Sequence, residues 1–220
     1  MIRNKTIKKK YLLQLINGVT KDTKKKVIIK DEKDLILYSY LVAGTVGLMM
    51  SNILEVKEKI ALKYALDLGI ALQLTNITRD ILEDANMNRV YIPTTWYKFK
   101  ASDIRIQKKK NQIKLKISTV KLLNISEKYY KSAIKGLAFL TLRNRFAILI
   151  ALMIYRQIGI KIIKNKFSNL HKREKVTFFE KILCMLICIK MFLFDSSLHK
   201  KNYNHNKSLH KFLKNLPIFE

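Results

Sequence analysis

Cysteine, glycine and proline are all scarce in this chain: its 220 residues include two cysteines, six glycines and two prolines. So few glycines and prolines disfavour a protein built from many tight turns and favour an all-α protein with short connections. The two cysteines, Cys184 and Cys188, provide no disulfide framework and are typical of a reducing cytosol. Their spacing places them on one face of a helix. We expect them in the core, because no further cysteine or histidine nearby has the spacing of zinc ligands.

Acidic residues are also scarce: 16 Asp and Glu stand against 44 Lys and Arg, which gives a formal net charge of +28. Nucleic-acid binding is one interpretation, but no zinc-finger, RNP or other recognition motif accompanies the charge, so we expect no nucleic acid as a partner. Attraction to an anionic membrane or to diphosphate substrates is a second. Compositional drift toward Lys, Ile and Asn is the third and is favoured, because the lysines are scattered rather than arranged in one stripe.

No secretory signal is evident, since residues 1–10 are charged and no apolar core follows them. The longest apolar stretches, residues 146–155 and 182–194, are too short for a membrane span or are interrupted by Lys190. They indicate buried or interfacial helices. The predicted location is the cytoplasm. Peripheral contact of the protein with the inner face of the membrane is a further prediction.

Hydrophobic periodicity predicts helices over most of the chain. The expected helices cover residues 4–17, 32–54, 56–84, 102–107, 112–138, 144–165 and 175–194, and the second is expected to bend around Gly44 and Gly47. A lysine-rich connection spans residues 19–33, and a loop with Pro93 spans residues 85–102. We expect one helical domain over residues 1–195, followed by a polar, loosely held tail over residues 196–220.

One predicted helix carries a stripe of polar side chains. Residues 71–90 contain no glycine or proline, and their apolar residues recur at helical spacing. Four polar residues fall on one narrow line of this helix: Gln73, Asn76, Asp80 and Asp84. Arg79 and Glu83 flank the line, while apolar side chains fill the remaining surface. A largely buried helix with such a stripe needs a binding partner for it.

Asp80 and Asp84 lie one turn apart, so their charges repel each other unless a cation lies between them. Carboxylate and amide oxygens suit Mg²⁺, which usually takes further ligands from water and from substrate phosphates. The competing interpretation is a solvated helix face with two ordinary acids, which is common for an isolated pair at this spacing. Gln73 and Asn76 on the same line, in a chain so poor in acids, favour the site.

Three segments together resemble a known family. The first is QLTNITRDILED at residues 73–84 with NRVYIP at residues 88–93, and the second is YSYLVAGTVG at residues 38–47. A looser third comprises residues 129–136 and 142–145 with Tyr155 and Arg173. These segments resemble the squalene/phytoene synthases, the head-to-head isoprenoid diphosphate synthases, over about residues 12–181. Residues 81–96 are most similar to the bacterial phytoene synthases.

The resemblance implies an isoprenoid-synthase-like helical bundle around a central cavity, incomplete toward its N-terminus. It implies Mg²⁺, with Mn²⁺ as the alternative, held by Asn76, Asp80 and Asp84. The implied catalytic residues are Tyr38, Arg79, Asp80 and Asp84. The implied substrate-binding residues are Val42, Ala43, Val46, Gly47, Gln73, Asn76, Arg89, Tyr91, Tyr155 and Arg173.

Several of these roles have a structural alternative. The small residues Ala43 and Gly47 suit tight helix packing as well as an open channel, and both can hold on different faces. Arg79 is placed for a salt bridge to Glu83 at i+4. Tyr155 and Arg173 equally suit a core and a surface position. Asn88 stands where the family more often has glycine, and asparagine tolerates the left-handed conformation that a helix end needs.

The implied activity is condensation of two prenyl diphosphates, with geranylgeranyl diphosphate giving phytoene through a cyclopropyl diphosphate intermediate. Farnesyl diphosphate and a squalene-type product are the alternative. The family's first aspartate-rich motif is expected several dozen residues before Tyr38, and this sequence starts too late to contain it. We therefore expect a truncated gene product, a split enzyme whose N-terminal part is a separate fragment, or a non-catalytic remnant.

Overall fold

Helices form nearly all of the regular structure in the computed structural model, which describes residues 7–23, 27–106, 108–214 and 216. The α-helices are α1 (Lys9–Thr20), α2 (Glu32–Ser39), α3 (Thr45–Ile53), α4 (Lys59–Arg79), α5 (Ile81–Asn86), α6 (Ala101–Arg105), α7 (Lys109–Gly136), α8 (Leu142–Lys164) and α9 (Phe178–Phe194). The short strands β1 (Val27–Ile28) and β2 (Arg89–Val90) pair in parallel. The predicted all-α fold class is confirmed.

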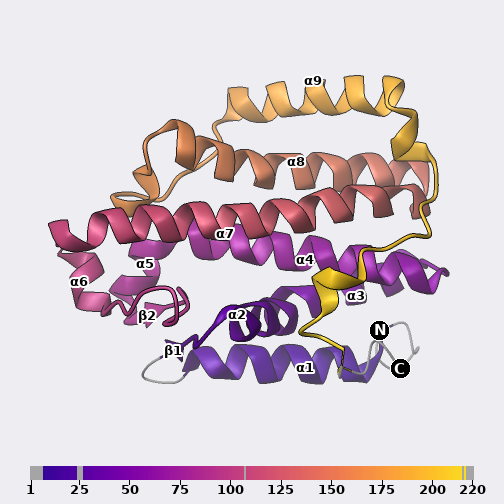
Figure 1. Ribbon diagram of the computed structural model, residues 1–220. Coiled ribbons are helices and arrows are strands. Elements are labelled where there is room, and N and C mark those ends of the chain that lie inside the picture. Colours follow the sequence, from indigo (N-terminus) through magenta and orange to yellow (C-terminus); the bar gives the residue numbers. More distant parts are fainter. Residues whose placement is uncertain (1–6, 24–26, 107, 215, 217–220) are drawn as a thin grey trace.

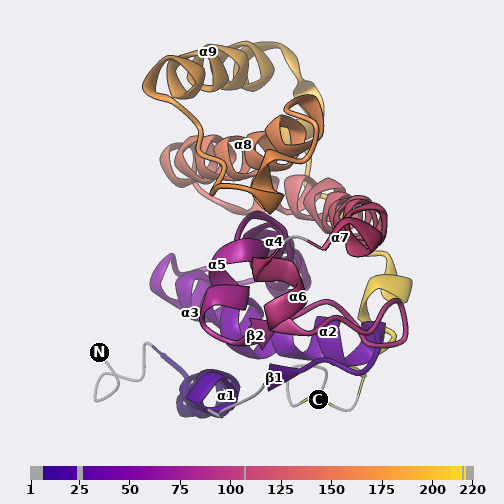
Figure 2. The ribbon, with the colours of Figure 1, turned by 90° about the vertical axis from the view of Figure 1, so that its left-hand side faces the viewer.

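The helices are stacked in layers (Figures 1 and 2). Helix α9 is outermost and lies over α8, which lies over α7. Helix α7 runs along α4, and α1 lies at the opposite side of the molecule from α9. Helix α4 is central because its apolar residues face several layers at once, and Leu66, Ile70 and Leu74 are completely buried. This central helix carries the polar stripe into the middle of the fold.

Two local departures from regular helix matter for the site. The predicted bend in the second helix is present as a π-helical turn, Tyr40–Gly44, between α2 and α3. The predicted helix over residues 56–84 is interrupted at Asp80, whose φ and ψ of −102° and 17° end α4 and precede α5. Backbone hydrogen bonds from Asp80 to Asn76 and from Asp84 to Asp80 nevertheless keep the helical spacing. Asp80 and Asp84 therefore remain one turn apart.

The C-terminal segment packs against the bundle, although the sequence suggested a loosely held tail. After α9 it runs down the side of the layers to the region of α2 and α3 (Figure 1). Leu198 and Leu213 are buried, and His210 is 4% exposed. The Tyr64 hydroxyl donates to the Asn202 carbonyl, and the Tyr129 hydroxyl donates to the Leu209 carbonyl. Buried tyrosine hydroxyls need such acceptors, and the polar backbone of this segment supplies them. The domain division at residue 195 stays a prediction.

Two helical stretches have the length and apolar composition of a membrane span: Glu32–Ile53 and Leu142–Lys164. The first is half buried inside the fold, and the core helix of a folded domain can pass the same test of length and composition. The second is one-third buried, and α7 and α9 pack against it. The second contains residues 146–155, which the sequence analysis treated as too short for a span, whereas the helix itself has 23 residues. Residues 182–194 lie in neither stretch. Length and composition alone carry no conclusion about a membrane span.

Candidate active site

The break between α4 and α5 exposes the Asp80 carboxylate to two arginines. Arg79 makes a bidentate contact, with Nε and Nη2 each 2.7 Å from one of the Asp80 oxygens. The Arg173 guanidinium reaches Asp80 Oδ1 at 3.1 Å and Glu83 Oε2 at 3.5 Å. The hydrogen bonds that Arg79 donates to Asp80 are the chief cause of a raised pKa for Arg79, while burial opposes the rise and Tyr155 adds a smaller contribution. The alternative of an Arg79–Glu83 salt bridge is wrong, because the irregular backbone at Asp80 turns this carboxylate toward Arg79 and leaves Glu83 to Arg173.

Unlike Asp80, which contacts two arginines, Asp84 has a strongly raised pKa. Burial, and then the nearby Asp80 carboxylate, raise its pKa from 3.8 to about 7, while Arg89 opposes the rise. Within the described ranges no cation lies at salt-bridge distance from Asp84. A half-buried carboxylate without a cation, one turn from a second carboxylate, is the kind of group that a divalent cation stabilises.

A second cluster lies beside Asp84 and centres on Asp22, a residue that the sequence analysis did not select. The hydroxyls of Tyr38 and Tyr91 donate to the Asp22 carboxylate at 2.8 and 2.9 Å, and Arg89 donates to the Asp22 carbonyl at 3.0 Å. The two tyrosine rings stack with centroids 5.0 Å apart. Burial is the first cause of a raised pKa for both hydroxyls, to about 12 for Tyr91, so both remain protonated donors. Asp22 also adds to the field that raises the pKa of Asp84.

An apolar cavity of about 370 Å³ lies beside the polar stripe. Its wall contains the predicted substrate-binding residues Val42, Ala43, Val46, Gly47, Gln73, Asn76 and Tyr155. Most of the remaining wall is aliphatic or aromatic. Tyr38 is not among the lining residues, since its side chain is buried against Asp22 and Tyr91. Gln73 and Asn76 line the cavity, and Asp80 and Asp84 follow on the next turns, so the polar stripe leads out of the cavity.

Gly47 contributes to packing as well as to the cavity. A Cβ atom at this position would lie 2.3 Å from the Ala65 carbonyl oxygen of α4. A Cβ at Gly69 of α4 would meet the Ala43 carbonyl oxygen at the same distance. The absence of side chains at these two glycines lets α3 and the preceding π-turn approach α4 closely, so the packing interpretation holds. Ala43 and Gly47 also line the cavity, and their role in a substrate channel stays a prediction. Val46 is 40% exposed and lines the cavity.

The residues of the stripe fit a divalent cation with a diphosphate. The Asn76 side-chain oxygen is buried without a hydrogen-bond partner, and such an orphaned acceptor is costly unless a ligand meets it. The Asp80 and Asp84 carboxylates provide hard oxygen ligands, as Mg²⁺ prefers. Arg79, Arg89 and Arg173 add cations nearby that suit phosphate oxygens. Asn88, with φ of 58°, adopts the left-handed conformation that was expected there.

The fold and this arrangement define an all-α protein in which two carboxylates and three arginines lie at the end of a polar stripe, beside an apolar cavity. Residues 1–180 match the family model of squalene/phytoene synthase. The chain belongs to the squalene/phytoene synthase family, as the sequence motifs predicted.

Individual relatives agree with this membership. The chain is 39% identical over 154 residues to the 15-cis-phytoene synthase of Pantoea ananas, covering 70% of this chain and 50% of that protein. It is 37% identical over 180 residues to the chloroplastic phytoene synthase 1 of Solanum lycopersicum, covering 79% and 43%. The crystal structure of a dehydrosqualene synthase with a bound ligand superposes with a TM-score of 0.69 and 25% identity, covering 85% of this chain and 66% of that one. The chain spans about half the length of the curated relatives it matches.

Proposed function

We propose that this chain provides the cavity and one acidic half-site of an enzyme that condenses two prenyl diphosphates head to head. Geranylgeranyl diphosphate is the first substrate proposed, with a cyclopropyl diphosphate intermediate and phytoene as the product. The observation that carries the proposal is the polar stripe of α4 and α5, which leads from an apolar cavity to two closely spaced carboxylates. Its relatives named phytoene synthase support the same reaction.

Each part of the site has a chemical role in this reaction. The apolar cavity removes the prenyl chain from water, which keeps water away from a carbocation. Gln73 and Asn76 orient the diphosphate at the cavity mouth, and Arg79, Arg89 and Arg173 place positive charge on its oxygens. Members of this family use divalent metal ions, and Asn76, Asp80 and Asp84 would hold Mg²⁺ here, or Mn²⁺ in its place. The bound ion supplies charge neutralisation for the departing pyrophosphate.

The second acidic half-site, which two diphosphates require, is proposed to come from a segment outside these 220 residues. Asp31 and Asp34 do not provide it, because they cap the start of α2: Asp31 accepts from the Asp34 backbone, and Asp34 accepts from the Lys30 backbone. The segment would belong to a longer form of the chain or to a separate N-terminal fragment. A non-catalytic remnant is the competing outcome.

Product formation tests these alternatives directly. The chain is expressed in cells that make geranylgeranyl diphosphate, alone or together with the N-terminal part of a phytoene synthase relative, and hydrocarbons are extracted. We expect phytoene only from the completed pair and its loss in the Asp80→Asn version of that pair. Product from the 220 residues alone would show that no second half-site is needed. No product from a pair that forms a stable complex would support the non-catalytic remnant.

Cavity depth should decide between geranylgeranyl and farnesyl diphosphate. Val46→Phe adds a ring to the cavity wall at a position with room for it, while Gly47→Leu would collide with the Ala65 carbonyl. In the completed enzyme we expect Val46→Phe to shift the preference toward the shorter substrate without unfolding the protein. Unchanged preference with full stability would place the prenyl chain elsewhere.

We also propose peripheral contact with an anionic membrane through α9, on the cytoplasmic side. Only Cys184 and Cys188 of this helix are buried, whereas Phe178, Phe179, Leu183, Leu186, Leu193 and Phe194 are exposed. The exposed Lys181 and Lys190 and the net charge of +28 complement anionic headgroups. The proposed prenyl substrates and hydrocarbon product are themselves membrane-soluble.

Vesicle flotation tests the membrane contact. The protein is mixed with vesicles of phosphatidylglycerol and phosphatidylcholine, or of phosphatidylcholine alone. We expect binding to the anionic vesicles and its loss in Leu186→Glu. Ile106→Glu, which changes an exposed apolar residue away from α9, is the matched control and should still bind. Equal binding by Leu186→Glu would exclude α9 as the contact.

A further inference from the structure

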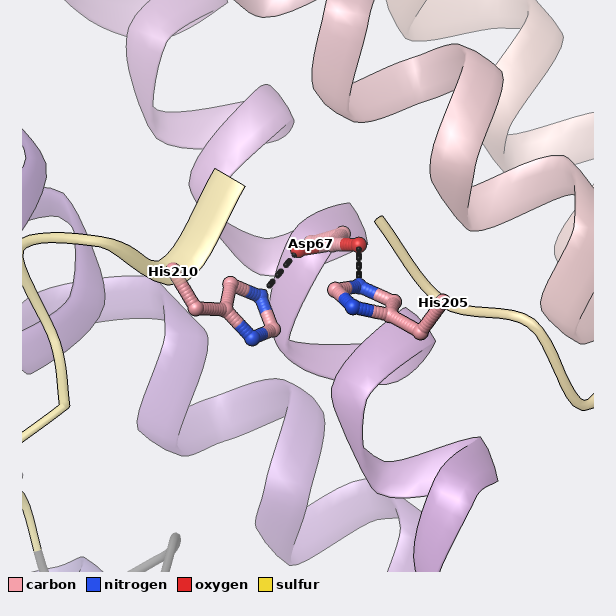
Figure 3. Close-up of side chains that lie close together, drawn as sticks. All are labelled: Asp67, His205 and His210. Atoms are coloured by element: carbon pink, nitrogen blue, oxygen red, sulfur yellow. Dashed lines mark hydrogen bonds and ion pairs between the residues drawn. The ribbon is translucent and has the colours of Figure 1, made fainter. Parts of the chain in front are cut away.

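A second group of ligand-type side chains lies away from the candidate active site. Asp67 of α4 is completely buried, and two histidines of the C-terminal segment contact its carboxylate (Figure 3). His210 Nε2 lies 2.6 Å from Oδ1, and His205 Nε2 lies 2.7 Å from Oδ2. The Ser132 hydroxyl of α7 donates to Oδ2 at 2.6 Å. Residues distant in sequence therefore meet at one buried carboxylate.

The arrangement has the chemistry of a transition-metal site. Both rings direct Nε2 at the same carboxylate, and one ligand atom from each residue lies within 4.8 Å of the other two. His205 and His210 are separated by four residues, which is within the spacing of histidine pairs that hold structural zinc. Two imidazole nitrogens and one carboxylate oxygen suit Zn²⁺ rather than Mg²⁺. Ser132 would orient the carboxylate from the outer shell, as partners of metal ligands usually do.

The charge of the cluster also favours a cation. The Asp67 carboxylate has no contact with water, and in the described part of the chain its only ion-pair partners are the two imidazoles, which carry charge only when protonated. A buried carboxylate beside neutral imidazoles keeps an uncompensated charge, which is costly. In the metal-free cluster Nε2 of each ring lies at hydrogen-bond distance from the carboxylate, and a bound metal would replace the proton on that nitrogen. The buried Nδ1 of His205 has no hydrogen-bond partner, so it is available to carry the ring proton when Nε2 binds a metal.

We propose that Asp67, His205 and His210 form a zinc site that fastens the C-terminal segment to α4. The ion would join positions far apart in the chain, beside the hydrogen bonds from Tyr64 and Tyr129 that already hold this segment. Because its ligand atoms and its place on α4 differ from those of Asp80 and Asp84, the two sites should bind their metals independently.

Metal binding by the full chain tests the site. The protein is stripped with a chelator and titrated with Zn²⁺ in the presence of excess Mg²⁺, and Co²⁺ is used as a spectroscopic probe. We expect one Zn²⁺ per chain, a higher unfolding temperature with Zn²⁺, and the visible absorption of low-coordinate Co²⁺. Zn²⁺ affinity should fall roughly a hundredfold or more in Asp67→Asn and His210→Gln, since even outer-shell losses cost about ten- to a hundredfold.

Three further variants make the result specific. His171→Gln removes an exposed histidine and Asp80→Asn changes the proposed magnesium site, so both should bind Zn²⁺ like the parent chain. His210→Cys exchanges one zinc ligand for another and should add a thiolate-to-cobalt charge-transfer band in the near ultraviolet, even where the Gln variant does not fold. A parent chain that binds no Zn²⁺, a His210→Cys protein without that band, or equal losses in His171→Gln and His210→Gln would overturn the proposal.

Discussion

Two acidic residues of the same helical run, Asp67 and Asp84, are both withdrawn from water but are treated differently by their surroundings. Asp67 is completely buried, and its oxygens contact two imidazoles and a hydroxyl. Burial, and then the nearby carboxylates of Asp80, Asp22 and Glu83, raise the pKa of Asp84 to about 7. The first arrangement holds two segments of the fold together. The arrangement around Asp84 lowers the stability of the ligand-free protein. Such destabilised groups are typical of sites where a bound ligand offsets the loss.

The sharpest test of this difference is removal of each carboxylate. Asp67→Ala leaves two imidazoles and the Ser132 hydroxyl without their acceptor in a buried place, so we expect the free energy of unfolding to fall by about 3 kcal/mol. Asp84→Ala removes a carboxylate that opposes Asp80 and should leave stability unchanged or higher. Urea unfolding at pH 7.5, in the presence of a chelator, measures both. Equal losses would show that Asp84 is also a structural carboxylate.

The pH dependence of stability should separate Asp84 from the other acids. Its pKa is near 4 in the unfolded chain and about 7 in the folded protein, so the unfolded state binds fewer protons between these values. This group therefore lowers stability progressively as pH rises from about 4 to 7. Asparagine does not titrate, so the free energy of unfolding of Asp84→Asn should exceed that of the parent by roughly 2 kcal/mol at pH 8. This figure is already reduced to account for the partial exposure of the side chain. The difference should vanish near pH 4. A constant difference across this range would contradict the assigned pKa.

Mg²⁺ and pyrophosphate should bind at Asp84 and not at Asp67, although Asp67 matters more for the stability of the ligand-free protein. With pyrophosphate present, Mg²⁺ binding is expected to depend on Asp80 and Asp84, and not on Asp67. Calorimetric titration of Mg²⁺ with and without pyrophosphate should show binding only with it, because two carboxylates alone hold Mg²⁺ weakly. Asp80→Asn should weaken this binding by about tenfold or more, which is about 1.4 kcal/mol. Binding that is equal in Asp80→Asn and in the parent chain would exclude Asp80 as a ligand.

Local sequence patterns reveal the polar stripe that ends at Asp84, but they do not reveal the Asp67 cluster. The stripe from Gln73 to Asp84 repeats at helical spacing within one segment, so periodicity and family motifs both reveal it. The break at Asp80 was not visible, because no glycine or proline marks it. No local pattern marks Asp22, because it lies in a lysine-rich connection. Only the folded chain brings the Tyr38 and Tyr91 hydroxyls into contact with its carboxylate.

The Asp67 cluster depends on contacts across most of the chain. The available signal was the pair His205 and His210 at zinc spacing, in a segment whose polar composition indicated a loosely held tail. Composition describes what a segment prefers when alone, whereas burial of Leu198 and Leu213 depends on the surface that the bundle offers. Tertiary contacts of this kind are invisible to periodicity.

The smallest expected effect compares two tyrosine hydroxyls, one near each carboxylate. The Tyr38 hydroxyl donates to the Asp22 carboxylate beside Asp84, and the Tyr129 hydroxyl donates to the Leu209 backbone in the segment that reaches Asp67. Tyr129→Phe should lower the free energy of unfolding by about 1 kcal/mol, because the Leu209 carbonyl loses a donor. Tyr38→Phe should cost a similar amount at pH 8, since a charged acceptor loses one of its two tyrosine donors.

Only the second change should alter the site. In Tyr38→Phe the Asp22 carboxylate has one hydrogen-bond donor fewer, so its negative charge repels the Asp84 carboxylate more strongly and the pKa of Asp84 should rise further. In Tyr129→Phe the pKa of Asp84 should stay unchanged. The carboxyl titration of Asp84, followed by NMR in both variants, measures this. An equal shift in the two variants, or a shift in Tyr129→Phe alone, would mean that the Asp22 cluster and the Asp84 carboxylate are not one electrostatic unit.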